Sequence, residues 1–195
     1  MIFTVKIEKA IVFSVKTHEM YQKQKRKGKD IPYITHPLTV GLILSRANAS
    51  EDVVIAGLLH DTIEDSKSDK KVTHEMLVER FGKNVADLVM SVTEQRKDLP
   101  WEERKNEAIE HIKTFSHDSL LVKSADLISN GSEILDDYEK EGVAIFDRFS
   151  APKHRVIWHY TEAMKAILGR WSENPFTEDL RGLIARFNEI ELEPS

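Results

Sequence analysis

Two adjacent pairs of ionisable residues follow one apolar segment of the chain. His60 and Asp61 come directly after the apolar run at 53–59, and Glu64 and Asp65 follow three residues later. Burying an imidazole and three carboxylates in an apolar core is unfavourable unless a cation or a substrate compensates them. The segment therefore predicts a metal site.

Three polar residues elsewhere in the chain have surroundings that suit the same site. His36 follows the segment PYIT where a helix is expected to begin, which makes it a candidate third ligand. Asp126 lies among apolar residues at 120–128, so it is predicted to be buried and to need a cation. Asn130 is four residues further on, which places its amide one turn away on the same helix face.

Each of these residues also has a simpler explanation. A single histidine such as His36 is usually a surface or hydrogen-bonded structural residue, and Asp126 could pair with Lys123 one turn earlier. Glu64 and Asp65 could form a solvated helix end. Four potential ligands at apolar helix ends of one helical chain nevertheless favour the metal site over these separate explanations.

Composition restricts the ligands and the class of function. The 195 residues include no cysteine, so disulfides, thiolate catalysis and cysteine-based metal sites are excluded, and hard or borderline divalent cations held by histidine and carboxylates are favoured. The net charge of −5 argues against broad binding to nucleic acid. No apolar stretch is long enough to cross a membrane and the first residues lack a secretory signal, so a cytoplasmic protein is expected. The oligomeric state stays open.

Apolar residues recur at helical spacing along most of the chain, which predicts an all-α fold. Thr35, Ser50 and Thr73 are expected to cap the helices that follow them. Thr177 is expected to cap the last helix, and the acidic end NEIELEPS to be a solvated tail. No repeat or long linker divides the chain, so residues 1–195 are predicted to form a single domain. Helices are expected over these segments: about 7–24, from 35 onward, from 50 to the His60 pair, 73–81, 85–92, about 101–115, from 118 or 119 onward, 152–171 and from 177 onward.

The order of the candidate ligands along the chain resembles the HD superfamily of metal-dependent phosphohydrolases. More narrowly, four segments resemble the (p)ppGpp hydrolase domain of Rel/SpoT enzymes and the stand-alone small alarmone hydrolases, including the metazoan SpoT homologue. The resemblance runs from about residue 13 to residue 130, and several motifs in the right order make it specific. The segments are KQKRKGKDIPYITHP, AGLLHDTIEDS, FGKNVADLVMSVTE and LVKSADLISN.

The resemblance implies the roles of the candidate residues. Glu64 and Asp65 match an acidic pair that orients and deprotonates the attacking water or protonates the leaving oxygen. Arg26 and Lys27 match a basic pair that contacts the nucleotide, although a solvated basic loop is the simpler explanation, and Asn130 matches a residue that binds the ribose. The expected ion is Mn²⁺, with four ligands: His36, His60, Asp61 and Asp126.

The activity that the resemblance implies is hydrolysis of the 3′-pyrophosphate of (p)ppGpp to GDP or GTP and pyrophosphate. Many relatives carry basic residues directly after the last aspartate ligand and beyond the asparagine, where this chain has Leu127, Gly131 and Ser132. Neutralisation of the second diphosphate therefore stays open. The alternatives are a phosphohydrolase for another nucleotide, such as (p)ppApp, NADPH or a simple nucleotide, and a non-catalytic nucleotide-binding regulatory module.

Overall fold

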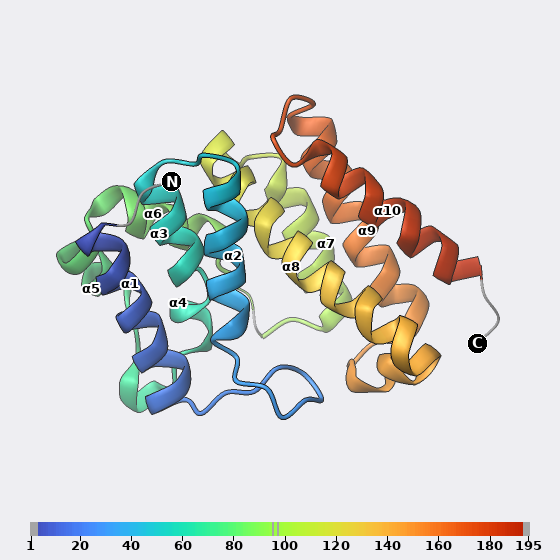
Figure 1. The fold of residues 1–195 in the computed structure, drawn as a ribbon, viewed down its shortest axis with the longest axis horizontal. Helices are drawn as coiled ribbons and strands as arrows, with labels where there is room; N and C mark the ends of the chain where they lie inside the picture. Colours follow the sequence, from blue (N-terminus) through green and yellow to red (C-terminus); the bar gives the residue numbers. More distant parts are fainter. Residues whose placement is uncertain (1–3, 95, 97, 193–195) are drawn as a thin grey trace.

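The computed structural model describes residues 4–94, 96 and 98–192. Helices make up the regular structure of this part of the chain, and its only β-type pairing is a single bridge between Lys25 and Pro32 (Figure 1). The all-α prediction is therefore confirmed. The helices in chain order are α1 Val5–Val15, the π-helix η1 Lys16–Tyr21, α2 Thr35–Arg46, α3 Glu51–Leu59, α4 Thr62–Asp65, the 3₁₀ helix η2 Ser68–Lys70, α5 His74–Phe81, α6 Lys83–Val92, α7 Trp101–Ile112, α8 His117–Glu141, the 3₁₀ helix η3 Gly142–Arg148, α9 Lys153–Arg170 and α10 Thr177–Leu192.

Helix α3 is apolar on every side, which places it in the core. Its N-terminus is capped as predicted, because the Ser50 side chain accepts a hydrogen bond from the amide of Val53. Every residue from Val53 to Leu59 is buried, as expected for a helix that packs against neighbours all round. The chain leaves this helix at His60, so the imidazole emerges inside the molecule rather than at its surface.

Two glycines allow α2 and α3 to pack closely. A Cβ atom at Gly57 would lie 2.3 Å from Leu44 Cδ1, and one at Gly41 would lie 2.7 Å from Leu58 Cδ2. Both leucines are buried, so neither side chain has free space to move into. The close approach brings the start of α2, which carries His36, towards the end of α3.

The long helix α8 runs through the centre of the molecule, with α2 on one side and the α9–α10 pair on the other (Figure 1). Its N-cap is Ser116, whose side chain accepts from the amide of Ser119, so the helix begins slightly earlier than the sequence predicts. Asp126 lies in the middle of α8 and is buried, as predicted. The three segments that carry the candidate ligands therefore meet in the core.

Several predicted boundaries differ from the structure. Thr35 and Thr177 are the first residues of their helices, and their hydroxyls donate to the carbonyls of Pro32 and Asn174 instead of capping. The first helical stretch, α1 followed directly by η1, ends at Tyr21 rather than near residue 24. The predicted tail is also wrong up to residue 192, because this stretch continues α10, and residues 193–195 lie outside the described part. Among the described helices, none has the length and apolarity needed to span a membrane.

Candidate metal centre

Four of the predicted site residues meet where α2, α3 and α8 converge. The ligand atoms of His36, His60 and Asp126 all lie within 4.8 Å of one another, and the three residues are buried. The two Nε2 atoms of the histidines are 3.2 Å apart, and His36 Nε2 is 3.3 Å from Asp126 Oδ1. Segments far apart in sequence thus place two imidazoles and a carboxylate around one point.

Asp61 joins the same cluster from the turn after α3. Its Oδ2 lies 3.0 Å from His60 Nε2 and 3.7 Å from His36 Nε2. Metal–ligand bonds of about 2.1 Å place neighbouring ligands of an octahedral ion about 3 Å apart. The separations in the cluster therefore fit a divalent cation.

Hydrogen bonds on the far side of each imidazole orient it towards the cluster. His60 Nδ1 lies 2.8 Å from the Gly57 carbonyl oxygen, which can only accept, so this nitrogen carries the proton and neutral His60 presents its Nε2 lone pair. His36 Nδ1 lies 2.9 Å from Ser129 Oγ, which can take the equivalent proton. Metal-binding histidines are usually oriented by partners of this kind.

Asp126 uses its two oxygens for different partners. Oδ2 accepts a 2.7 Å hydrogen bond from Lys123 Nζ, so the simpler pairing considered from the sequence does occur. Oδ1 faces the histidines and accepts a 2.7 Å bond from Asn130 Nδ2, one turn further along α8. The ion pair and the ligand position are therefore compatible, because they involve different oxygens.

The electrostatics of the cluster show that it attracts positive charge. Burial opposes the charged form of His60, but Asp61 and Asp126 outweigh it and raise the pKa of His60 to about 9. Burial also opposes ionisation of Asp61, yet neighbouring His60 lowers the pKa of this carboxyl group. His36, for which burial dominates, has a lowered pKa. The carboxylates thus favour a cation at this point, whether a proton or a metal ion.

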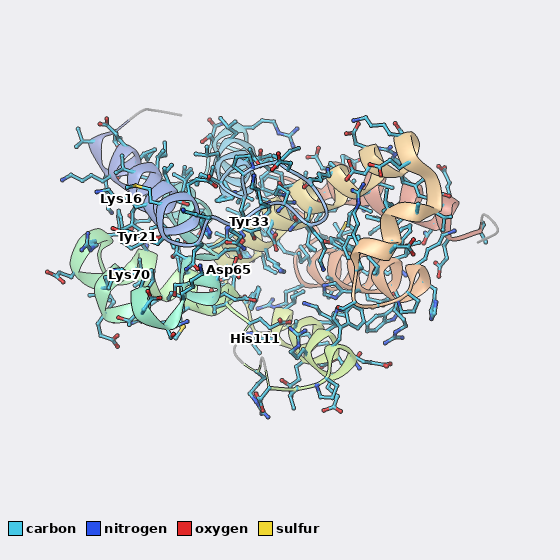
Figure 2. All side chains as sticks on the ribbon, turned by 90° about the horizontal axis from the view of Figure 1, so that it is seen from below. Lys16, Tyr21, Tyr33, Asp65, Lys70 and His111 are labelled. Carbon is cyan, nitrogen blue, oxygen red and sulfur yellow. The ribbon has the colours of Figure 1, made fainter. Side chains whose placement is uncertain are left out.

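A cavity of about 650 Å³ adjoins the cluster and is large enough for a nucleotide. His60, Asp61 and Asp126 line it, and Figure 2 labels two residues of its other walls, Tyr33 from the loop before α2 and His111 from α7. The cluster is therefore open to a small molecule on this side.

The two predicted acid–base residues lie differently. Glu64 lines the cavity, and its Oε2 accepts a 3.1 Å hydrogen bond from the amide of Glu94. Asp65 does not line it; its Oδ2 accepts a 2.8 Å bond from Gln24 Nε2. Of the pair, Glu64 is thus the one that faces the cavity directly.

The three predicted nucleotide contacts lie at the edge of this cavity or in a smaller one beside it. Asn130 and Lys27 line both it and a smaller neighbouring cavity of about 170 Å³. Arg26 lines the smaller one, donates a 2.7 Å hydrogen bond to Asn130 Oδ1 and is ion-paired with Glu133. Lys27 Nζ lies 4.7 Å from the centre of the Phe149 ring. Arg26 is consequently held by protein groups, whereas Lys27 lies over an aromatic ring.

Several residues of the site were not found from the sequence. Tyr33 lines the cavity and donates a hydrogen bond to Asp61 Oδ2. Arg104 and Lys105 on α7 also line it, and both pair with Glu94. The only available signal was an arginine–lysine pair in a charged helix, which is common on protein surfaces.

Comparison with known proteins agrees with this geometry. A sequence model of the HD domain family matches residues 10–153. The zebrafish guanosine-3′,5′-bis(diphosphate) 3′-pyrophosphohydrolase MESH1 is 41% identical over 115 residues, covering 57% of this chain and 61% of the relative. The Aquifex aeolicus protein named guanosine-3′,5′-bis(diphosphate) 3′-pyrophosphohydrolase is 44% identical over 87 residues, 45% of this chain and 11% of that protein.

The solved structure of a metazoan orthologue of SpoT, described as hydrolysing ppGpp, superposes with a TM-score of 0.72 at 25% sequence identity. The superposition covers 97% of this chain and 96% of that one. In sequence, the matched segment spans about three fifths of the zebrafish relative. Because the family match extends over most of the chain and contains the histidine–aspartate cluster, the protein belongs to the HD domain family.

Proposed function

We propose that the protein is a metal-dependent hydrolase that removes the 3′-pyrophosphate of (p)ppGpp and yields GDP or GTP and pyrophosphate. The observation that carries this proposal is the buried His36, His60 and Asp126 cluster, with Asp61 beside it, at the wall of a nucleotide-sized cavity. The homologous pyrophosphohydrolases supply the choice of substrate.

The four side chains would hold a divalent ion, and Mn²⁺ is the proposed one. Such an ion stabilises negative charge on a phosphate oxygen and makes water a stronger nucleophile at neutral pH. The remaining hydrogen bonds keep the site in position: Gly57 and Ser129 orient the two imidazoles, and Tyr33 holds Asp61. The predicted cytoplasmic location belongs to the same proposal.

Hydrolysis breaks the bond between the ribose 3′-oxygen and the adjacent phosphorus, to which the oxygen of water becomes attached. The water loses a proton and the 3′-oxygen gains one. Glu64 is the proposed group for this proton transfer because its carboxylate lines the cavity. Asp65, which accepts a hydrogen bond from Gln24 and does not line the cavity, is proposed to assist Glu64 in this proton transfer. General acid–base help of this kind is worth roughly 10² to 10⁴ in rate.

Lys27 and Asn130 are proposed to contact the nucleotide from the edge of the cavity, in keeping with their positions at the junction of the two cavities. Arg26 is proposed to act beside them. Because Arg26 is ion-paired with Glu133 and hydrogen-bonded to Asn130, its first effect is to position the asparagine amide.

The test is incubation of the purified protein with ppGpp and Mn²⁺, with and without a chelator, followed by separation of the nucleotides. We expect GDP and pyrophosphate to form only when the metal is available. His60→Ala should abolish the reaction, and His74→Ala, which changes a histidine paired with Asp87 at the surface, is the matched control. Intact ppGpp together with consumption of another phosphorylated nucleotide would overturn the substrate assignment. Consumption that is unchanged in His60→Ala would overturn the proposed site.

A further inference from the structure

The wall of the cavity away from the metal ligands carries an excess of positive charge. Lys27 comes from the loop before α2, and Arg104 and Lys105 come from α7. One carboxylate, Glu94, pairs with both α7 residues, at 2.9 Å from Lys105 Nζ. Within the described residues Lys27 makes no ion pair. Two of these three cationic groups are therefore paired with one carboxylate, and the third, Lys27, is not; Glu107 of α7 is a second carboxylate that lines the cavity.

Lys27 and Lys105 lie close enough to affect one another. Partial burial and then the charge of Lys105 lower the pKa of Lys27. Two ammonium groups that repel one another at the wall of a cavity are both stabilised by an anion placed between them. A phosphate group, with several acceptor oxygens, is the natural ligand for such a pair.

His159 on α9 places a further polar atom at the same wall. Its ring lines the cavity and is packed edge-on against Trp101 and Tyr160. The Nδ1 atom is buried and has no hydrogen-bond partner in the described part of the protein. An unsatisfied buried polar atom is unfavourable, and it commonly marks the place of a ligand or an ordered water.

We propose that Lys27, Lys105 and His159 form a second phosphate-binding subsite, which holds the 5′-diphosphate of the nucleotide while its 3′-diphosphate lies at the metal centre. The assignment rests on the proposed function. It also accounts for the departure at Leu127, Gly131 and Ser132, because the second diphosphate is then neutralised from α7 and the loop before α2 rather than from α8, with a polar contact from α9.

The first experiment compares two substrates: ppGpp and guanosine 3′-diphosphate, which lacks the 5′-diphosphate. Lys105→Gln removes a charge, and His159→Phe removes the buried nitrogen while keeping a ring against Trp101 and Tyr160. Each change should lower kcat/KM for ppGpp roughly 10- to 100-fold, mainly through KM, since it removes a charge-assisted or buried hydrogen bond. The loss for guanosine 3′-diphosphate should be at least fivefold smaller. Equal losses for both substrates would overturn the subsite.

The second experiment does not depend on hydrolysis. Inorganic pyrophosphate is titrated into the full-length protein in the presence of a chelator, and binding is followed by calorimetry. Wild-type protein should bind one pyrophosphate, and Lys105→Gln and His159→Phe should each weaken binding about tenfold or more. Lys113→Gln, an exposed lysine at the end of α7 that pairs with Glu110, is the matched control and should bind like wild type.

The two experiments separate failure of the subsite from failure of the proposed function. Absence of pyrophosphate binding to wild type, or binding by both variants that is as tight as that of wild type, overturns the subsite even if ppGpp is hydrolysed. Pyrophosphate binding that both variants weaken, in a protein that leaves ppGpp intact, retains the phosphate subsite and rejects the substrate assignment. Circular dichroism and thermal unfolding of each variant show whether it is folded.

Discussion

Two walls of one cavity differ in how their charges are held. The wall formed by α2, α3 and α8 carries buried histidines and carboxylates, whose atoms are fixed by carbonyl, hydroxyl and amide partners. The wall formed by α7, α9 and the loop before α2 carries partly exposed cations, two of which pair with Glu94. The first arrangement suits a small ion that demands fixed geometry, and the second suits the less demanding phosphate groups of a nucleotide.

The largest effect is expected from a substitution in the wall formed by α2, α3 and α8, here called the buried wall. His60→Ala removes one ligand and should reduce kcat for ppGpp roughly a thousandfold or more, because several kcal/mol of transition-state stabilisation depend on the metal. Steady-state kinetics with Mn²⁺ in excess measure this. A loss no larger than that of Lys105→Gln would show that the two walls do not differ in the proposed way.

The next effect concerns the orientation of His36. Ser129→Ala removes the hydroxyl that lies 2.9 Å from His36 Nδ1 and should weaken Mn²⁺ binding about 10- to 100-fold. Ser132→Ala, on the exposed face of the same helix, is the control and should bind Mn²⁺ as wild type does. Titration of Mn²⁺ into Ser129→Ala, Ser132→Ala and wild type measures the three affinities. Equal affinity for Ser129→Ala and wild type would mean that the imidazole needs no such support.

A third effect concerns the packing that holds the buried wall together. Gly57→Ala places a methyl group within 2.3 Å of Leu44 Cδ1 and should lower the free energy of unfolding by about 1 to 3 kcal/mol. Gly182→Ala in α10, where a Cβ meets nothing within 4 Å, should be neutral or stabilising by up to about 1 kcal/mol. Denaturant unfolding measures both. If the two substitutions changed stability equally, close packing of α2 and α3 would not be what positions the ligands.

The smallest expected effect is a difference between the two walls in how strongly salt weakens ligand binding. Raising NaCl from about 50 to 300 mM shortens the Debye length from about 14 to about 6 Å. The dissociation constant of pyrophosphate in the presence of chelator should then rise severalfold, whereas that of Mn²⁺ should change less because its ligands are buried. Equal sensitivity of the two would argue that both walls are equally exposed to solvent.

The buried wall could be predicted from the sequence largely because its residues stand out from apolar surroundings. His60 and Asp61 follow an apolar helix, and Asp126 lies within another, so the sequence itself indicates that these polar groups are buried at a cost in free energy. The helical fold was equally visible from spacing. His36 was a weaker candidate from its place at a helix start, and the resemblance to a family with the same order of ligands supported it.

Lys27 of the other wall was found through the family resemblance, but the residues that α7 and α9 contribute could not be predicted from residue types. Lys105 and Arg104 lie in the charged stretch EERKNE, which is typical of a solvated helix, and only the packing of α7 against α9 turns them towards the cavity. His159 lies among polar and apolar neighbours with no distinctive spacing. The predicted caps at Ser50 and Thr73 are present, whereas those at Thr35 and Thr177 are not. The hydroxyls of Thr35 and Thr177 donate to nearby carbonyls, which a sequence pattern does not reveal.

The most direct test of the central claim is a calorimetric titration of Mn²⁺ into metal-free protein, made in parallel for wild type, His60→Ala and Lys105→Gln. The account predicts one ion per chain for wild type and for Lys105→Gln, and loss of that binding in His60→Ala. Binding that survives unchanged in His60→Ala, or is lost in Lys105→Gln as well, would contradict it.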